Sequence, residues 1–179
     1  MVTLEVTTVI HAPIERCFDL ARSVEVHLAG NVHSGESAVA TGGVISGLID
    51  LGQRVTWRAK HFGVWHNLTS EITAMDRPAS FQDTMVRGIF RFMQHDHFFR
   101  ALPGKENETE MMDVFRFASP IPGLGRLAEI LFLRRYMEAL LNERNAAIKE
   151  IAESNDWPAY LGDWQALIDL NSCRKRGYC

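Results

Sequence analysis

A single long helix is the feature that most limits how this chain can fold. We predict it from Pro122 to about Ser154, which at about 1.5 Å per residue gives a rod on the order of 45 Å long. Its later two-thirds carry apolar side chains at helical spacing: Ile130, Leu133, Met137, Leu140, Leu141, Ala147, Ile148 and Ile151. Charged and amide side chains occupy the opposite face. One side of the helix is therefore suited to lie on an apolar surface formed by the rest of the chain.

The segments before this helix alternate apolar and polar side chains, which is typical of β-strands with one buried face. We expect strands over Val2–Ile10, Gln53–His61, Trp65–Met75, Phe81–Val86, Phe90–Leu102 and Glu108–Phe117, and a weak one near Ala38–Ala40. Two short helices are expected over Ile14–Ala21 and Val24–Leu28. Strands that are segregated from a terminal helix indicate an α+β fold. We expect the sheet to curve around the long helix, with a cavity between them.

The composition is that of an ordinary globular protein, with 46% hydrophobic and 23% charged residues in a chain of 179. This length fits one domain, which we place at residues 1–155 and follow with a C-terminal tail at 156–179. A net charge of -3 argues against a nucleic-acid partner, and no apolar run reaches the roughly 18 residues of a membrane span. We see no signal peptide and no C-x-x-C pair, so we expect a cytoplasmic protein.

Five short patterns, in order along the chain, carry a resemblance to a known family. They are Pro78-x-x-Phe81-x-Asp83, Gly88-x-Phe90, His95-x-His97-x-Phe99, Thr109-x-Met111-x-Asp113 and Pro120-x-Pro122-x-Leu124-Gly125. Together they resemble a bacterial ligand-binding branch of the START/Bet v 1-like superfamily, also called SRPBCC or polyketide cyclase/dehydrase-like, over Val2 to Glu153. The resemblance implies the helix-grip fold, in which a curved seven-stranded antiparallel sheet wraps around a long C-terminal helix. It also implies an internal apolar pocket.

Members of this superfamily bind lipids, sterols, polyketides or hormones, and some are aromatases or cyclases. The first hypothesis is therefore a protein that binds a small hydrophobic ligand, of lipid, polyketide or aromatic type, in the internal cavity. The second is an enzyme of the polyketide cyclase or aromatase type that uses the same cavity, and the third is a partner-binding module. We assign no catalytic residue. A homodimer is one arrangement that would cover the apolar start of the long helix.

Two histidines lie close together on one expected strand. Because His95 and His97 are two residues apart, their side chains share a face. The turn at 103–107 sets a register in which His97 faces Asp113 and His95 faces Phe115. An aspartate opposite a histidine can hold the imidazole in one tautomer. The pair is then a satisfied structural contact of the sheet, a polar anchor for a ligand, or a general acid or base.

Arg144 interrupts the apolar stripe of the long helix. A buried guanidinium needs an acceptor, so we expect it to have a hydrogen-bonded partner. Three roles remain open for this side chain. The first is a structural ion pair. The second is an apolar stem that carries the guanidinium out to water at the mouth of the pocket, and the third is a clamp for a ligand carboxylate or phenolate.

We expect neither a metal site nor a cofactor. Zinc normally takes three or four converging ligands, and the pair of His95 and His97 supplies two. His61 and His66 are further candidates, but the alternation places His61 inward with Trp57 only if its strand stays regular that far. The chain also lacks a full dinucleotide fingerprint and a Gly-x-Ser-x-Gly elbow. The ligand-binding residues that we predict are Trp57, Leu68, His95, His97, Phe99, Met111, Asp113, Phe115, Met137 and Arg144.

Overall fold

The computed structural model describes residues 1–30, 36–41, 43–118 and 132–161, and it contains one antiparallel sheet. The sheet has seven strands in the order β1-β7-β6-β5-β4-β3-β2. The strands are β1 (Val2–Ile10), β2 (Ser37–Ala38), β3 (Arg54–His61), β4 (Val64–Asp76), β5 (Ser80–Arg87), β6 (Phe92–Leu102) and β7 (Lys105–Ala118). The helical elements are α1 (Ile14–Ala21), α2 (Val24–Gly30), α4 (Arg134–Glu153) and the 3-10 helix η3 (Trp157–Leu161). The α+β architecture predicted from the sequence is confirmed.

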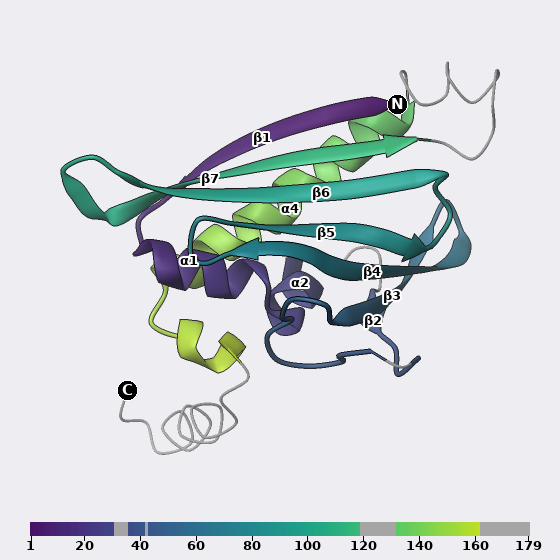
Figure 1. The fold of residues 1–179 in the computed structure, drawn as a ribbon, viewed down its shortest axis with the longest axis horizontal. Coiled ribbons are helices and arrows are strands. Elements are labelled where there is room, and N and C mark those ends of the chain that lie inside the picture. Colours follow the sequence, from purple (N-terminus) through teal and green to yellow (C-terminus); the bar gives the residue numbers. More distant parts are fainter. Residues whose placement is uncertain (31–35, 42, 119–131, 162–179) are drawn as a thin grey trace.

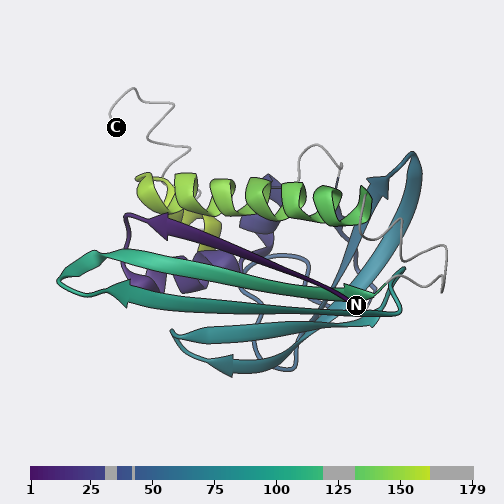
Figure 2. The ribbon, with the colours of Figure 1, turned by 90° about the horizontal axis from the view of Figure 1, so that it is seen from above.

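The sheet curves around α4, which lies along one of its faces beside β1 (Figure 1). Figure 2 shows β3 and β4 rising beside the end of α4 at which that helix begins. The pairing of β4 with β5 shifts register between Thr69 and Ser70 and again between Ile72 and Ala74. Such irregularities bend a strand and increase its twist. They lie in the strands where the sheet turns toward the helix.

The short helices cover the other end of the same face. The side chain of Phe18 on α1 is fully buried, and its ring meets the rings of Phe81 and Phe99 edge-on at 5.6 and 5.5 Å between centroids. Such edge-to-face contacts are favourable beyond the burial of area alone. A second apolar cluster, built around Phe115 and Phe117, lies where α4 covers β1, β7 and β6. The larger of the two clusters is the one that includes α1.

The buried face of α4 matches the predicted stripe over its later turns. Leu141, Ile148 and Ile151 are buried as expected. The polar side chains of Arg144 and Asn145 are buried on the same face. The helix ends at Glu153, close to the predicted end. The predicted stretch from Pro122 to residue 131 lies outside the described residues.

The starts of two strands differ from the prediction by two residues or more, and both differences come from the connections. β6 begins at Phe92 rather than Phe90, because residues 88–91 form the reversal that joins two antiparallel neighbours. β7 begins at Lys105 rather than Glu108, because the turn after β6 needs only Pro103 and Gly104. Gly104 has a φ of 74°, which glycine adopts without steric cost, so the hairpin closes tightly there.

The 3-10 helix η3 packs back onto the short helices. The guanidinium of Arg16 lies 4.5 Å from the centre of the Trp157 ring, and the hydroxyl of Ser23 donates a hydrogen bond to the carbonyl oxygen of Tyr160. Trp164 and Leu167, through which we expect the tail to pack, lie outside the described residues. Among the helices that the structure describes, none combines the length and the apolar character needed to cross a membrane.

Candidate functional site

Three neighbouring strands bring titratable side chains together in the interior of the sheet. The pairing of β6 with β7 sets His97 opposite Asp113 and His95 opposite Phe115, so the predicted register is confirmed. The pairing of β5 with β6 sets Asp83 opposite His95. Because side chains alternate along a strand, these groups project from the same face. We call Asp83, His95, His97, Asp113 and Arg144 the polar cluster.

His95 lies between two carboxylates. Its Nε2 atom is 2.8 Å from Oδ1 of Asp113, and its Nδ1 atom is 3.8 Å from Oδ2 of Asp83. A carboxylate oxygen accepts hydrogen bonds, so Nε2 carries the proton and donates it to Asp113. In a neutral ring the lone pair is then on Nδ1, which faces Asp83.

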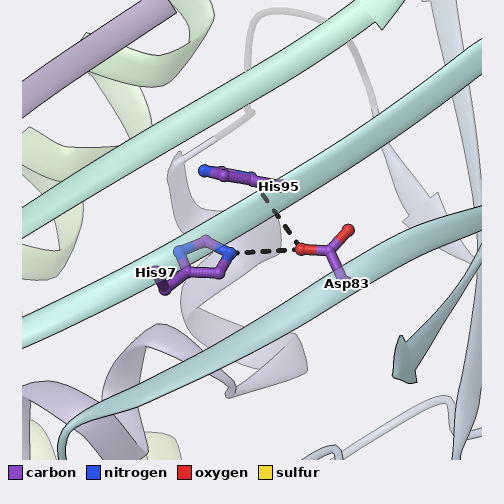
Figure 3. Close-up of side chains that lie close together, drawn as sticks. All are labelled: Asp83, His95 and His97. Carbon is purple, nitrogen blue, oxygen red and sulfur yellow. Dashed lines mark hydrogen bonds and ion pairs between the residues drawn. The ribbon is translucent and has the colours of Figure 1, made fainter. Parts of the chain in front are cut away.

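His97 lies against the same two carboxylates from the next inward position on β6. Its Nε2 atom is 3.1 Å from Oδ2 of Asp83, as Figure 3 shows. Its Nδ1 atom lies 2.7 Å from Oδ1 of Asp113, but the approach lacks the angles of a hydrogen bond, so among the described residues this buried atom has no hydrogen-bond partner. The ring stacks on Phe81 at 4.1 Å between centroids, which fixes its plane.

The helix α4 supplies the remaining partners of Asp113. Nδ2 of Asn145 donates a hydrogen bond of 2.7 Å to Oδ2 of Asp113. Nη1 of Arg144 lies 3.4 Å from Oδ1, while Nη2 donates to the carbonyl oxygen of Ala21 at 2.8 Å. The prediction that Arg144 is buried with a hydrogen-bonded acceptor is therefore confirmed. Asn145 was not singled out from the sequence, because one amide in a helix gives no signal of burial.

Burial and hydrogen bonding act in opposite directions on the carboxylates of the cluster. Burial opposes the ionisation of Asp113, but the hydrogen bond from His95 and the charge of His97 outweigh it and hold the pKa of Asp113 well below its usual range. Burial likewise opposes ionisation of Asp83, and the hydrogen bond from His97 outweighs it, so the pKa of Asp83 is lowered. Both carboxylates are therefore charged at neutral pH.

The imidazole of His95 behaves in the opposite way. Its burial, and after that its repulsion by the charge of His97, lower its pKa to about 4, against the hydrogen bond and charge of Asp113. His95 is therefore neutral at pH 7. A neutral imidazole keeps one ring nitrogen with a free lone pair, which can accept a proton or bind a metal.

A pocket of about 190 Å³ lies between the sheet and α4, and the polar cluster forms part of its wall. Seven of the predicted ligand-binding residues line it: Trp57, Leu68, His95, His97, Phe115, Met137 and Arg144. Asp113 lies behind the two histidines, outside the lining. Phe99 and Met111 are also buried outside the lining, because α1 covers that end of the sheet with Phe18. Whether any of the ten residues contacts a ligand stays a prediction.

Asp83 is the wall residue that was missed from the sequence as a partner of the histidines. The alternation of Phe81, Asp83 and Met85 was a usable signal, because it places all three on one face of their strand. The structure places ligand atoms of Asp83, His95 and His97 within 4.8 Å of one another, an arrangement that could hold a metal ion. The expected absence of a metal site rested on counting two ligands, and this geometry supplies a third.

No protein-family model matches this chain. Solved structures with the same fold do match it. A protein from Thermus thermophilus is 22% identical, with a TM-score of 0.63 over 86% of this chain and 100% of that one. A START superfamily protein from Mycobacterium smegmatis is 10% identical, with a TM-score of 0.60 over 84% and 97%. Ginseng major latex-like protein 151 from Panax ginseng is 14% identical, with a TM-score of 0.60 over 86% and 98%.

These identities are low, so the matches concern the path of the chain rather than the residues of the site. The similarity extends over nearly the whole length of each protein matched. The chain has the START/Bet v 1-like fold.

Proposed function

We propose that this protein binds a small, mostly apolar ligand with one or two polar groups in the pocket between the sheet and α4. The observation that carries the proposal is the make-up of the pocket wall. Apolar side chains such as Leu68, Phe115 and Met137 form much of it, and the polar cluster meets it at His95 and His97. Apolar walls with a few convergent polar groups are typical of sites for small molecules.

The size of the pocket narrows the class of ligand. Its volume of about 190 Å³ is below the roughly 300–1,000 Å³ of pockets that hold drug-sized molecules. A compact ligand of one or two rings fits this space better than a lipid chain or a sterol. We therefore favour the aromatic type among the ligand classes implied by the resemblance, with a hydroxyl or carbonyl oxygen directed at the two histidines.

The proposal is tested with 2-naphthol, a fluorescent two-ring phenol, titrated into the full chain. We expect saturable binding to one site. Leu68→Trp, which fills the pocket from β4, should weaken the affinity by at least about tenfold. Val64→Trp is the matched control, because it adds the same side chain to an exposed position of the same strand. Equal affinities in both variants, with wild-type melting temperatures, would place the probe outside this pocket.

Catalysis at the same wall is the second candidate, and the hydrogen bond from His95 to Asp113 favours it. A neutral imidazole held by a carboxylate can remove a proton from a carbon acid beside a carbonyl. Incorporation of deuterium from D₂O into 1-phenyl-1,3-butanedione, followed by NMR, measures this activity. We expect a rate above the buffer rate in wild type that falls in Asp113→Asn. A rate equal to that of buffer would leave binding as the function of the pocket.

We also propose a cytoplasmic location, and the unpaired thiol of Cys17 is compatible with a reducing compartment. Cys17 is buried as a free thiol, and burial raises its pKa to about 11, so it is unreactive.

A homodimer remains a prediction for this protein. Sedimentation velocity over a hundredfold range of concentration measures it.

A further inference from the structure

We propose that Asp83, His95 and His97 bind a divalent first-row transition-metal ion at the wall of the pocket. The three side chains come from β5 and β6, and their ligand atoms lie within 4.8 Å of one another. Figure 3 shows both imidazole rings beside the same carboxylate. Two histidines and one carboxylate are a known ligand set for Fe²⁺ and related ions, and it leaves coordination positions open. This inference goes beyond the proposed binding of an apolar ligand.

The position of the proton on His95 is the first reason. Because Nε2 donates to Asp113, the nitrogen of His95 left to bind a metal is Nδ1, which lies 3.8 Å from Oδ2 of Asp83. The same oxygen of Asp83 lies 3.1 Å from Nε2 of His97, so one carboxylate oxygen faces a ring nitrogen of each histidine. A cation in this space would have all three ligand atoms within reach.

His97 gives a second, independent reason. Its Nδ1 atom is buried and lacks a hydrogen bond, although Oδ1 of Asp113 is 2.7 Å away. If Nε2 binds a metal, the proton of the neutral ring resides on Nδ1, and a small rotation of the ring directs it to Asp113. Each histidine would then donate a hydrogen bond from one ring nitrogen to Asp113 and bind the metal through the other. A carboxylate that holds the ligating imidazoles in this way is the usual outer partner in metal sites.

The distances leave little movement to be made. Metal bonds of about 2.0–2.2 Å place neighbouring ligand atoms about 3.0–3.5 Å apart. Oδ2 of Asp83 lies 3.1 Å from Nε2 of His97 and 3.8 Å from Nδ1 of His95. The three atoms all lie within 4.8 Å of one another, so the two imidazole rings have to approach by up to about 1.3 Å to reach that range, which changes in side-chain torsion angles allow.

The charges of the polar cluster also favour a cation. Asp83 and Asp113 place two carboxylates in the cluster against the one guanidinium of Arg144. The carboxylate of Asp83 is paired with the two histidines. A divalent ion bound there would be neutralised in part by these carboxylates. Because the three ligands also line the pocket, the open positions of the metal face the space proposed for the ligand.

The test uses untagged full-length protein stripped with a chelator, with Co²⁺ and Zn²⁺ as probes. We expect one ion per chain by calorimetry and a visible Co²⁺ absorption spectrum that Zn²⁺ abolishes. Asp83→Asn should weaken Co²⁺ binding by about 100-fold, and the positioning variant Asp113→Asn by about 10- to 100-fold with a changed spectrum. His11→Gln is the matched control, because it removes an exposed histidine and should leave affinity unchanged.

Equal Co²⁺ affinity in wild type and a folded Asp83→Asn, or no binding to wild type, overturns the proposal. Should Asp83→Asn fail to fold, the wild type decides by ¹⁵N NMR of its histidines. Saturating Zn²⁺ should move the ring nitrogens of His95 and His97 and not those of His11, and any other pattern contradicts the site. Failure of the pocket proposal can be distinguished from failure of the metal proposal, because Leu68→Trp should lose affinity for 2-naphthol while it keeps its affinity for Co²⁺.

Discussion

At the scale of single residues, Asp113 is the carboxylate at which the buried hydrogen bonds of the polar cluster meet. It is fully buried, and it accepts hydrogen bonds from His95 on β6 and Asn145 on α4. A buried carboxylate of this kind is tolerated because each of its oxygens has a donor. Its depressed pKa reflects those partners. Removing any one of them should therefore be costly.

Arg144→Leu tests that cost directly. It removes the cation beside Asp113 and the donor to the carbonyl oxygen of Ala21, so we expect the free energy of unfolding to fall by about 3 kcal/mol. Urea denaturation measures it. The double variant Arg144→Leu, Asp113→Asn should lose less free energy of unfolding than the sum of the losses in the two single variants, because the interaction that the two residues share is lost only once. A single variant within about 0.5 kcal/mol of wild type would show that the guanidinium contributes nothing net.

Asp96 gives a prediction about pH on the outer face of the sheet. Asp96 is buried there, because Arg116, Gln82 and Gln94 cover it and donate hydrogen bonds to its carboxylate. Burial opposes its ionisation, and these hydrogen bonds outweigh burial, so its pKa in the folded protein lies below the ordinary 3.8. Its contribution to stability is thus present above pH 3.8 and is lost as the pH falls through the folded pKa.

The measurement compares wild type with Asp96→Asn by urea denaturation from pH 6 down to pH 3. The variant should be less stable at pH 6, and the difference should shrink toward the acid end. A difference that does not change with pH would mean that Asp96 acts through neutral hydrogen bonds rather than through its charge. Glu5→Gln, a change of charge at an exposed position, is the control.

At the scale of elements, the contact of α2 with α4 depends on a glycine. A Cβ atom added to Gly30 would lie 2.9 Å from the Cα atom of Arg144, which is closer than real Cβ atoms approach backbone. The two helices would have to separate. We expect Gly30→Ala to lower the free energy of unfolding by about 1–3 kcal/mol, as overpacking does elsewhere.

Gly88→Ala is the comparison for that variant. The added Cβ atom would lie 2.6 Å from Sδ of Met85, which is the flexible end of a side chain and can move away. Both variants gain similarly from the reduced freedom of the unfolded chain. We therefore expect Gly88→Ala to cost less than Gly30→Ala in thermal denaturation. The reverse order would show that the approach of α2 to α4 is adjustable.

The elements themselves were predictable where one physical pattern dominated. The alternation of β1 and the apolar stripe of α4 identified them, and the short turn after β6 fixed which residues of β7 face it. The pairing of β5 with β6 was not predictable, because the reversal at 88–91 is no standard hairpin and does not set a register. That pairing brings Asp83 to His95 and His97, so the full site could not be assembled from sequence alone.

At the scale of the whole molecule, the layers follow from the order of the elements. Strands before a long apolar-striped helix leave that helix one large surface to cover, and the sheet supplies it (Figure 2). The position and size of the pocket do not follow in the same way. They depend on how far the sheet bends at the register shifts of β4 and β5 and on how completely α1 fills one end, and neither is written in a local pattern.

The neighbour of β1 in the sheet also bears on how the chain is made. β1 pairs with β7, which comes about a hundred residues later, so β1 leaves the ribosome long before its neighbour in the sheet. Non-local pairing of this kind delays folding. Ribosome-bound chains exposing only residues 1–102 should be digested by protease, whereas chains exposing residues 1–161 should resist it. Resistance of the shorter chain would mean that β1 finds a temporary partner during synthesis.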